Sequence, residues 1–237
     1  MHIILDIDGT LIDGNGYQVY PRPYLKEFFD FCFSFYESVS IWTAAGNKWY
    51  NKVYNEVFKS FLPKGKAFRF VFTEKRCVKV IDWNFIENSG SASDSGGIDS
   101  RIVIKPLLKV WKKHKYMTRH NTLIVDDTPY TYSRNYGNAI PIRTYKKKNV
   151  QEDTELLKLQ QWIIKTMSDI TSSVRSIEKR YWSSSLFYSS SSSSLNSCSS
   201  SSSLNSSYLL SSSSFSSNSR RDNSNLIHSN SFSSSTS

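Results

Sequence analysis

The sequence predicts an α/β fold with a mostly parallel central sheet. Two observations indicate this class. Short apolar, β-prone segments alternate along the chain with segments whose apolar residues recur every three or four positions, as expected for strands that alternate with amphipathic helices. Several apolar segments also end at a polar residue. Right-handed crossovers between parallel strands bring such ends to one edge of a sheet, where ligands bind.

The N-terminal segment predicts a buried strand followed by a helix. Residues 2–5 are apolar or β-prone and end at Asp6, which is typical of a strand that runs into a loop. Pro21 and Pro23 suit the start of a helix. The apolar residues between 25 and 36 recur at three- and four-residue spacing, so we expect an amphipathic helix there.

A second strand and helix follow the same plan. Residues 39–42 are apolar and stop at a turn formed by residues 43–46. The apolar residues from 49 to 58 then recur with helical spacing. A third strand is expected at residues 68–72, which are rich in aromatic residues.

The rest of the domain predicts an inserted ribbon and the remaining sheet. Residues 78–83 and 98–104 are β-prone and flank a loop rich in glycine and serine, as in two paired strands. The later elements are a short basic helix at 107–115, strands at 122–125 and 139–142, and a closing helix from 152 to about 168. The first turn of that helix is acidic, which the helix dipole favours.

Serine dominates the C-terminal part of the chain. More than half of residues 183–237 are serine, and such a segment buries too little apolar surface to offset the entropy lost on ordering. We therefore expect a disordered, low-complexity tail there. The remaining residues 1–182 are enough for one well-buried domain.

The predicted domain is basic. The chain has a formal net charge of +10, and lysines cluster at residues 109–115 and 146–148. A basic surface favours anionic partners such as phosphoproteins, acidic peptides or nucleic acid, although a solvated helix face is the simpler explanation of each cluster. No nucleic-acid-binding motif accompanies the lysines, so nucleic acid is the less favoured partner.

The sequence indicates a soluble intracellular protein, nuclear or cytoplasmic, with no membrane partner. The N-terminal apolar run meets two aspartates, Asp6 and Asp8, which is untypical of a signal peptide. No stretch is long enough to cross a bilayer. The three cysteines show no CxxC spacing, and they form no disulfide framework.

Six polar residues fall where the predicted sheet edge would gather them. They are Asp6 and Asp8 after the first strand, Thr43 after the second, Lys105 before a helix, and Asp126 and Asp127 after a later strand. Carboxylates brought together repel one another unless a cation lies among them. Mg²⁺ prefers such oxygen ligands together with a substrate phosphate, so the four aspartates predict a magnesium site.

These residue types suit phosphoryl transfer through a covalent intermediate. The transition state spreads charge over equatorial oxygens and requires positioned positive charge, which Mg²⁺ and Lys105 would supply. Thr43 and the backbone amides of Ala44 and its neighbours would hold the remaining oxygens. Asp6 would attack phosphorus to give an acyl-phosphate, and Asp8 would protonate the leaving oxygen and then activate water.

Four motifs resemble those of the haloacid dehalogenase (HAD) phosphatase superfamily. They are Asp6-Ile7-Asp8-Gly9-Thr10-Leu11, Thr43, Lys105 and Val125-Asp126-Asp127-Thr128-Pro129. Further segments, between residue 1 and about residue 162, are similar to the family of CTD phosphatases and NLI-interacting-factor-like proteins. They are Arg22-Pro23 before an aromatic helix, Ile41-Trp42-Thr43-Ala44, the segment from Asp127-Thr128-Pro129 to Asn138-Ala139-Ile140, and Asp153-Thr154-Glu155-Leu156-Leu157.

The resemblance implies a fold and an activity. The fold is the HAD-like, Rossmannoid three-layer arrangement, with a small β-insert at about residues 73–104 in place of a large cap. The activity is Mg²⁺-dependent dephosphorylation of phosphoserine or phosphothreonine in a protein segment, through an aspartyl-phosphate.

The resemblance also implies roles for the motif residues. Asp6 would be the nucleophile and a metal ligand, and Asp8 the acid and base, with its backbone carbonyl on the metal. Thr43 and Lys105 would hold the phosphate. Asp127 stands where many members have a metal-binding asparagine, and Asp126 is the acidic residue beside it.

Two other functions remain open for the same residues. A HAD phosphatase with this site could act on a small-molecule or nucleic-acid phosphate, because Gly9 and residues 73–77 depart from the pattern of the CTD phosphatases. The other is a non-catalytic binding protein on the same fold. Loss of motif carboxylates would be expected in such a protein, whereas Asp6 and Asp8 are present here.

Overall fold

The computed structural model describes residues 1–81, 101–168 and 173–184. All of them lie in the compact unit Met1–Asn196. The predicted loop between the two ribbon strands and all of the predicted tail at 183–237 except its first two residues lie outside the described residues.

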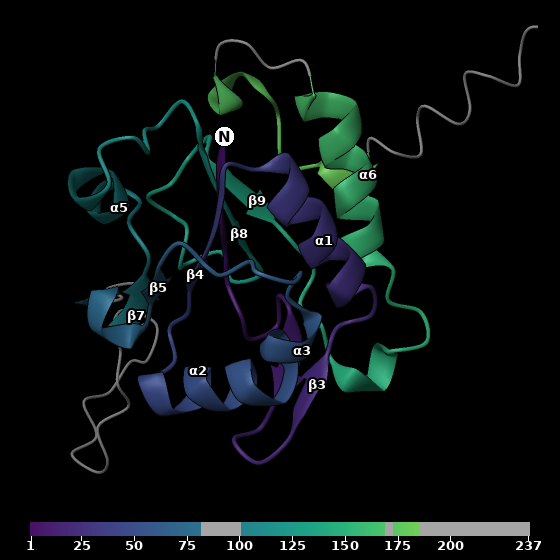
Figure 1. Cartoon of the computed structure of the whole chain (residues 1–237). Helices are drawn as coiled ribbons and strands as arrows, with labels where there is room; N and C mark the ends of the chain where they lie inside the picture. The colour runs from purple at the N-terminus through teal and green to yellow at the C-terminus, as the bar shows by residue number, and fades with distance from the viewer. Residues whose placement is uncertain (82–100, 169–172, 185–237) are drawn as a thin grey trace, which may run out of the picture. The chain divides into compact units, whose positions relative to one another are not determined.

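Five strands form one sheet in which every neighbouring pair is parallel (Figure 1). In sheet order they are β5 (Val71–Phe72), β4 (Ser38–Trp42), β1 (His2–Leu5), β8 (Thr122–Asp126) and β9 (Ala139–Pro141). The predicted parallel sheet is confirmed. The last residue of β1, Leu5, pairs with Ile41 and Val125 in the two flanking strands. These three strands therefore end at the same edge of the sheet.

Helices cover both faces of this sheet, which confirms the predicted three-layer α/β class (Figure 1). They are α1 (Leu25–Phe35), α2 (Asn47–Val53), α3 (Lys59–Phe61), α5 (Leu108–Lys113) and α6 (Glu155–Met167). Successive side chains of a strand point to opposite faces. Accordingly, Ile3 and Leu5 of β1 pack in the core cluster that contains the buried residues of α1 and α6, and Ile4 packs in the cluster that contains Val110 of α5.

The core under α1 is rich in aromatic rings. This helix buries Leu25, Phe28, Phe29, Phe31 and Cys32, the apolar positions that predicted it. The ring of Phe29 lies 5.4 Å from that of Phe58 and 5.7 Å from that of Phe68, both edge to face. Such pairs add about 0.5–1.5 kcal/mol each beyond their buried area.

The second helical segment contains a π-helical turn that the sequence did not predict. Helix α2 continues through a π turn at Tyr54–Phe58 into α3. A π turn inserts one residue into the helical repeat. Apolar spacing does not reveal this insertion, because the register changes by a single residue and the buried residues Val53, Val57 and Phe58 still fit a helical pattern.

Two antiparallel pairs lie outside the central sheet. The pair β6 (Val78–Ile81) and β7 (Arg101–Ile104) confirms the predicted ribbon. The hairpin of β2 (Ile12–Gly14) and β3 (Val19–Pro21) was not predicted. Its strands have three residues each, too few for an alternating pattern to stand out. Strand β5 is also shorter than the expected strand at residues 68–72.

The last described segment packs back onto the domain. Trp182 is buried, its ring lies 6.1 Å from that of Trp162 in α6, and its indole N–H donates to the carbonyl of Pro141 in β9. Val174 is also buried, and its backbone N–H donates to the carbonyl of His120 at 2.9 Å. Within the described parts of the chain, no helix is both long enough and apolar enough to cross a membrane.

Candidate active site

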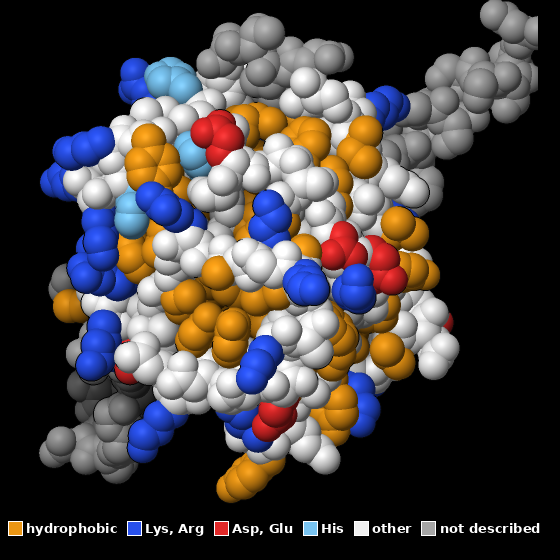
Figure 2. Space-filling view, in the orientation of Figure 1, with side chains coloured by type: hydrophobic (Ala, Val, Ile, Leu, Met, Phe, Trp, Pro, Cys, Tyr) orange, Lys and Arg blue, Asp and Glu red, His pale blue; other side chains and the backbone are white. Residues whose placement is uncertain are grey.

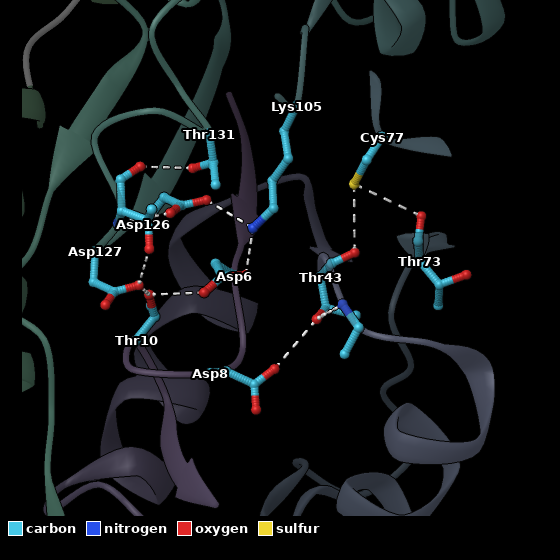
Figure 3. Close-up of polar contacts among 12 residues, drawn as sticks. Asp6, Asp8, Thr10, Thr43, Thr73, Cys77, Lys105, Asp126, Asp127 and Thr131 are labelled. Carbon is cyan, nitrogen blue, oxygen red and sulfur yellow. Dashed lines mark hydrogen bonds and ion pairs between the residues drawn. The ribbon is translucent and has the colours of Figure 1, made fainter. Parts of the chain in front are cut away.

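The ends of the central strands bring together residues that are far apart in sequence (Figure 3). Asp6 follows β1, Asp126 ends β8, and Lys105 follows β7. The Lys105 ammonium donates to Asp126 Oδ2 at 2.7 Å and also to Asp6 Oδ1. All three side chains are buried. The backbone N–H of Lys105 donates to the carbonyl of Thr131 at 2.7 Å, which fixes the lysine against the loop that follows Asp126 and Asp127.

Three carboxylates of this site form a compact acidic group. Asp6, Asp126 and Asp127 each offer one oxygen, and these oxygens all lie within 4.8 Å of one another. They come from the ends of two neighbouring strands, and Mg²⁺ takes carboxylate oxygens of this kind. The donor chemistry and the spacing therefore fit a hard divalent cation, with Asp127 the most exposed of the three ligand candidates.

Threonine hydroxyls orient the acidic group. Thr10 Oγ1 donates to Asp6 Oδ2 at 3.2 Å and lies 3.5 Å from Asp127 Oδ1. Thr144 Oγ1 donates to Asp127 Oδ2 at 2.7 Å. Neither threonine is among the site residues predicted from the sequence. Thr10 lies in the first motif and could have been found there, whereas Thr144 carries no motif and meets Asp127 only through the fold.

Gly9 allows Asp127 to approach the first loop closely. Gly9 has a φ of +78°, and a Cβ atom on it would lie 2.4 Å from Asp127 Oδ2. A side chain would therefore be strained by the backbone conformation and would also collide with a carboxylate of the site. This contact is a local reason for glycine at a position where the sequence departs from the CTD phosphatase pattern.

The Asp8 side chain points away from the acidic group and toward α2. Its Oδ1 accepts from the indole N–H of Trp49 at 2.7 Å, and its Oδ2 accepts from Thr43 Oγ1 at 3.4 Å. The structure thus does not place the Asp8 carboxylate among the three metal-ligand candidates. Only the Asp8 backbone carbonyl remains for the metal-binding role that the resemblance implies.

Trp49 is a site residue whose spacing in the sequence predicted only a place in a helix. Gly14 makes room for its ring, because a Cβ atom on Gly14 would lie 2.6 Å from Trp49 Cζ2. The ring therefore packs against Gly14 while its N–H donates to Asp8. The only sequence feature that could have predicted its role in the site was a tryptophan in the first turn of the helix that follows Thr43.

Burial and neighbouring charges set the ionisation of these groups. Burial raises the pKa of Asp6, Lys105 lowers it, and the charge of Asp126 raises it again, with a net increase. Burial also raises the pKa of Asp8, although the hydrogen bonds from Trp49 and Thr43 partly oppose that increase. For Lys105, burial lowers the pKa, but the two carboxylates outweigh it and hold the lysine protonated.

Thr43 and Ala44 lie in the turn between β4 and α2. Thr43 is buried, and its Oγ1 accepts from the backbone N–H of Ala45 at 3.0 Å. None of the hydrogen bonds among the described residues uses the N–H of Ala44. A hydroxyl and an unused backbone amide in this turn are groups that can bind phosphate oxygens.

A buried ion pair supports the first loop from behind. Arg22 donates through Nε to Asp153 Oδ1 at 2.9 Å and through Nη2 to Asp153 Oδ2 at 3.0 Å. Its Nη1 donates to the carbonyl of Thr10 at 3.0 Å. Arg22 thereby ties the loop that carries Asp6 and Asp8 to the segment that precedes α6.

Comparison with known families shows which family the chain belongs to. The family model described as "NLI interacting factor-like phosphatase" matches residues 1–175. The chain belongs to this family. As the motifs indicated, it is a HAD protein of the CTD phosphatase group.

Relatives of this NLI interacting factor-like chain are named as CTD phosphatases. Ubiquitin-like domain-containing CTD phosphatase 1 of Xenopus tropicalis is 29% identical over 176 residues, which are 68% of this chain and 48% of that protein. Ubiquitin-like domain-containing CTD phosphatase of Arabidopsis thaliana is 27% identical over 189 residues, which are 77% of this chain and 50% of that protein. The chain thus spans about half the length of the relatives that it matches.

A solved structure of Fcp1, an essential RNA polymerase II CTD phosphatase, is also similar. It has a TM-score of 0.43 and 14% sequence identity, and the match covers 73% of this chain and 68% of that chain.

Proposed function

We propose that this protein is a magnesium-dependent phosphatase that works through phosphorylation of Asp6. The observation that carries the proposal is the Lys105 ammonium bound between Asp6 and Asp126, with Asp127 completing an acidic group and Asp8 two residues from Asp6. A nucleophile, a fixed cation and metal ligands at the ends of neighbouring strands suit phosphoryl transfer.

In the first step the Asp6 carboxylate attacks phosphorus and the bond from phosphorus to the leaving oxygen breaks. Asp8, whose pKa is raised by burial, gives its proton to that oxygen. Thr43, the Ala44 amide and Lys105 hold the oxygens of the phosphoryl group. Bound Mg²⁺ would supply positive charge beside these oxygens and would favour the ionised form of Asp6.

In the second step water hydrolyses the aspartyl-phosphate. Asp8 has become a carboxylate and takes a proton from water as the water oxygen attacks phosphorus. The bond between Asp6 and phosphorus breaks, and phosphate leaves with the Asp6 carboxylate regenerated. The same Asp8 thus serves as acid and then as base, and Trp49 supports the charged form that it holds between the two steps.

We propose a phosphorylated serine or threonine of a protein segment as the substrate. Two observations support this class. The relatives of the chain carry the name CTD phosphatase, and the surface around the β-insert is basic. Glu74 is the only acidic residue in the segments 64–81 and 101–121. Lysine and arginine side chains line the side of the view in Figure 2 on which Figure 1 places α5.

Removal of divalent metal is expected to abolish phosphate release. The purified full chain should release phosphate from phenyl phosphate and from a phosphoserine peptide in the presence of Mg²⁺. EDTA should stop both reactions, and an excess of Mg²⁺ should restore them, because three adjacent carboxylates need a cation to bind a further anion. Phosphate release would be measured colorimetrically.

Comparison of substrates tests the proposed class. The value of kcat/KM should be higher for the phosphopeptide than for a nucleoside monophosphate or a 5′-phosphorylated oligonucleotide. Turnover that persists in EDTA would contradict the metal-dependent mechanism. A higher kcat/KM for nucleotides would be compatible with the proposed mechanism but would contradict the proposal that the substrate is a phosphorylated protein.

Substitution of Trp49 by phenylalanine is expected to move the titration of Asp8 to higher pH. The indole N–H stabilises the charged carboxylate and so lowers its pKa, and a phenyl ring keeps the packing without the donor. The alkaline limb of kcat/KM for phenyl phosphate reports the loss of the protonated acid in the free enzyme. That limb should shift upward in pH in Trp49→Phe.

Trp111 provides a matched control. Its buried indole nitrogen has no hydrogen-bond partner among the described residues, so Trp111→Phe should leave the pH profile unchanged. An alkaline limb that stays in place in Trp49→Phe would show that Trp49 does not set the ionisation of Asp8.

A further inference from the structure

A cavity of about 410 Å³ lies beside the sheet edge formed by β9, with walls that contain none of the candidate catalytic residues. One wall is the loop at residues 132–137, and the other is the segment at residues 175–180. This volume is in the range of small-molecule sites, about 300–1,000 Å³. The cavity has no role in the proposed phosphatase reaction.

The charged residues of the cavity leave an excess of positive charge. Arg175, Lys179 and Arg180 line it together with a single acid, Glu178. Glu178 pairs with Arg180, whose Nη2 lies 2.8 Å from Glu178 Oε2. Among the described residues, no carboxylate forms an ion pair with Arg175 or Lys179. Arg175 and Lys179 are therefore not ion-paired, and the only acid that acts on Lys179 in the described part of the cavity is the neighbouring Glu178, which also pairs with Arg180.

Lys179 needs an anionic partner more than Arg175 does, because it is buried, with an exposed fraction of 3%. Its ammonium donates to the carbonyl of Val174 and to that of Ile177, the latter at 2.6 Å. These acceptors carry no net charge, and burial lowers the pKa of Lys179 to about 8. Glu178 raises this pKa only in part, so the net pKa stays lowered. A buried ammonium that forms no ion pair is costly, so an anionic ligand would be stabilised here.

Arg175 is fixed on the wall of the same cavity. Its Nη1 donates to the carbonyl of Tyr136 at 2.6 Å and to Asn138 Oδ1 at 2.7 Å. Gly137, with a φ of +81°, lies against the guanidinium, and a Cβ atom there would be 3.2 Å from Arg175 Cζ. The remaining guanidinium nitrogens have no partner among the described residues. The planar guanidinium can therefore donate hydrogen bonds to an oxyanion.

The other lining residues are largely apolar or aromatic. They include Tyr132, Tyr136, Ala139, Pro141 and Ile177. Such a surface suits the body of an organic ligand, whereas two unpaired cations suit a dianion. We propose that this cavity binds a small organic monophosphate with an aromatic or apolar body, whose phosphate pairs with Arg175 and Lys179.

Binding of phenylphosphonate to the full chain tests this proposal, because a phosphonate carries the charge of a phosphate and is not hydrolysed. In ¹⁵N NMR spectra, the amide signals of Gly137 and Ser176 should shift with saturation. The same shifts should occur in Asp6→Asn, because the cavity does not use the phosphatase site. The measurement on Asp6→Asn therefore tests ligand binding in the cavity independently of the proposed phosphatase activity.

Arg175→Gln should weaken the response at Gly137 at least about tenfold, as expected for loss of a charge-assisted hydrogen bond. Lys179→Met should weaken it as well, and it removes the buried charge without adding a polar group. Arg134→Gln is the matched control, since Arg134 lies on the same loop but does not line the cavity, and it should bind like the wild type. Wild-type turnover of phenyl phosphate should persist in Arg175→Gln.

Two further ligands test the chemistry of the site. Inorganic phosphate and benzoate should each bind at least about tenfold more weakly than phenylphosphonate, because each lacks one of the two features that the cavity matches. If phosphate binds as tightly as phenylphosphonate, the cavity does not recognise an apolar body. If benzoate binds as tightly, the cavity does not prefer a dianion. A Gly137 response that is absent in the wild type, or unchanged in both Arg175→Gln and Lys179→Met, would refute the site.

Discussion

The Asp6→Asn variant is expected to release phosphate at least about 10⁴-fold more slowly than the wild type, since loss of a covalent nucleophile typically has an effect of this order. Asparagine has nearly the same shape as aspartate but cannot form the acyl-phosphate. The measurement is kcat with phenyl phosphate at saturating Mg²⁺. Mass spectrometry should in addition detect a trapped phosphoryl group, or a beryllium fluoride adduct, on the wild type and not on the variant.

Folding must be shown to survive this substitution. Lys105 keeps its bond to Asp126 in Asp6→Asn, so the variant should unfold at a denaturant concentration close to that of the wild type. Asp30→Asn is the control, because Asp30 is exposed on α1 and should retain full activity. A folded Asp6→Asn variant with wild-type turnover would exclude Asp6 as the nucleophile.

Among the variants described here, Arg22→Met is expected to show the largest loss of stability. Arg22 and Asp153 are both buried and share two hydrogen bonds, so Arg22→Met leaves a carboxylate without its partner in the interior. Breaking a buried pair in this way typically costs about 3–5 kcal/mol. Urea unfolding should show that decrease in the free energy of unfolding, together with reduced activity, because Arg22 also holds the carbonyl of Thr10.

The double variant Arg22→Met/Asp153→Leu separates the ion pair from simple loss of packing. An apolar pair leaves no unpaired charge, and replacement of a whole buried pair is often close to neutral. The double variant should therefore be more stable than either single variant. If the effects of the two single variants simply add, the two side chains are not coupled as the geometry indicates.

Much of the fold followed from the sequence because the central strands are short, apolar and bounded by turns. Residues 2–5, 39–42 and 122–125 are recognisable for this reason, and their observed counterparts β1, β4 and β8 are buried along most of their length. The hairpin at residues 12–21 escaped because its strands are short and partly polar. The π turn escaped because it changes the register by one residue only.

Some residues of the candidate site could likewise be predicted from the sequence and others could not. Asp6, Thr43 and Asp126 could be predicted because each stands at the end of a strand that its neighbours define. The bond between Trp49 and Asp8 joins residues 41 positions apart, and the bond between Thr144 and Asp127 joins two separate loops. Such contacts depend on how loops pack after the sheet has formed, and no local pattern encodes them.

The central position of β1 has a consequence for synthesis of the chain. Strand β1 is synthesised before both of its partners in the sheet, β4 and β8, and β8 begins only at Thr122. A nascent chain that ends before residue 122 has no neighbour for one edge of β1 and lacks Asp126 and Asp127 altogether. Contacts between such distant residues form slowly. Activity should therefore emerge late and abruptly during translation.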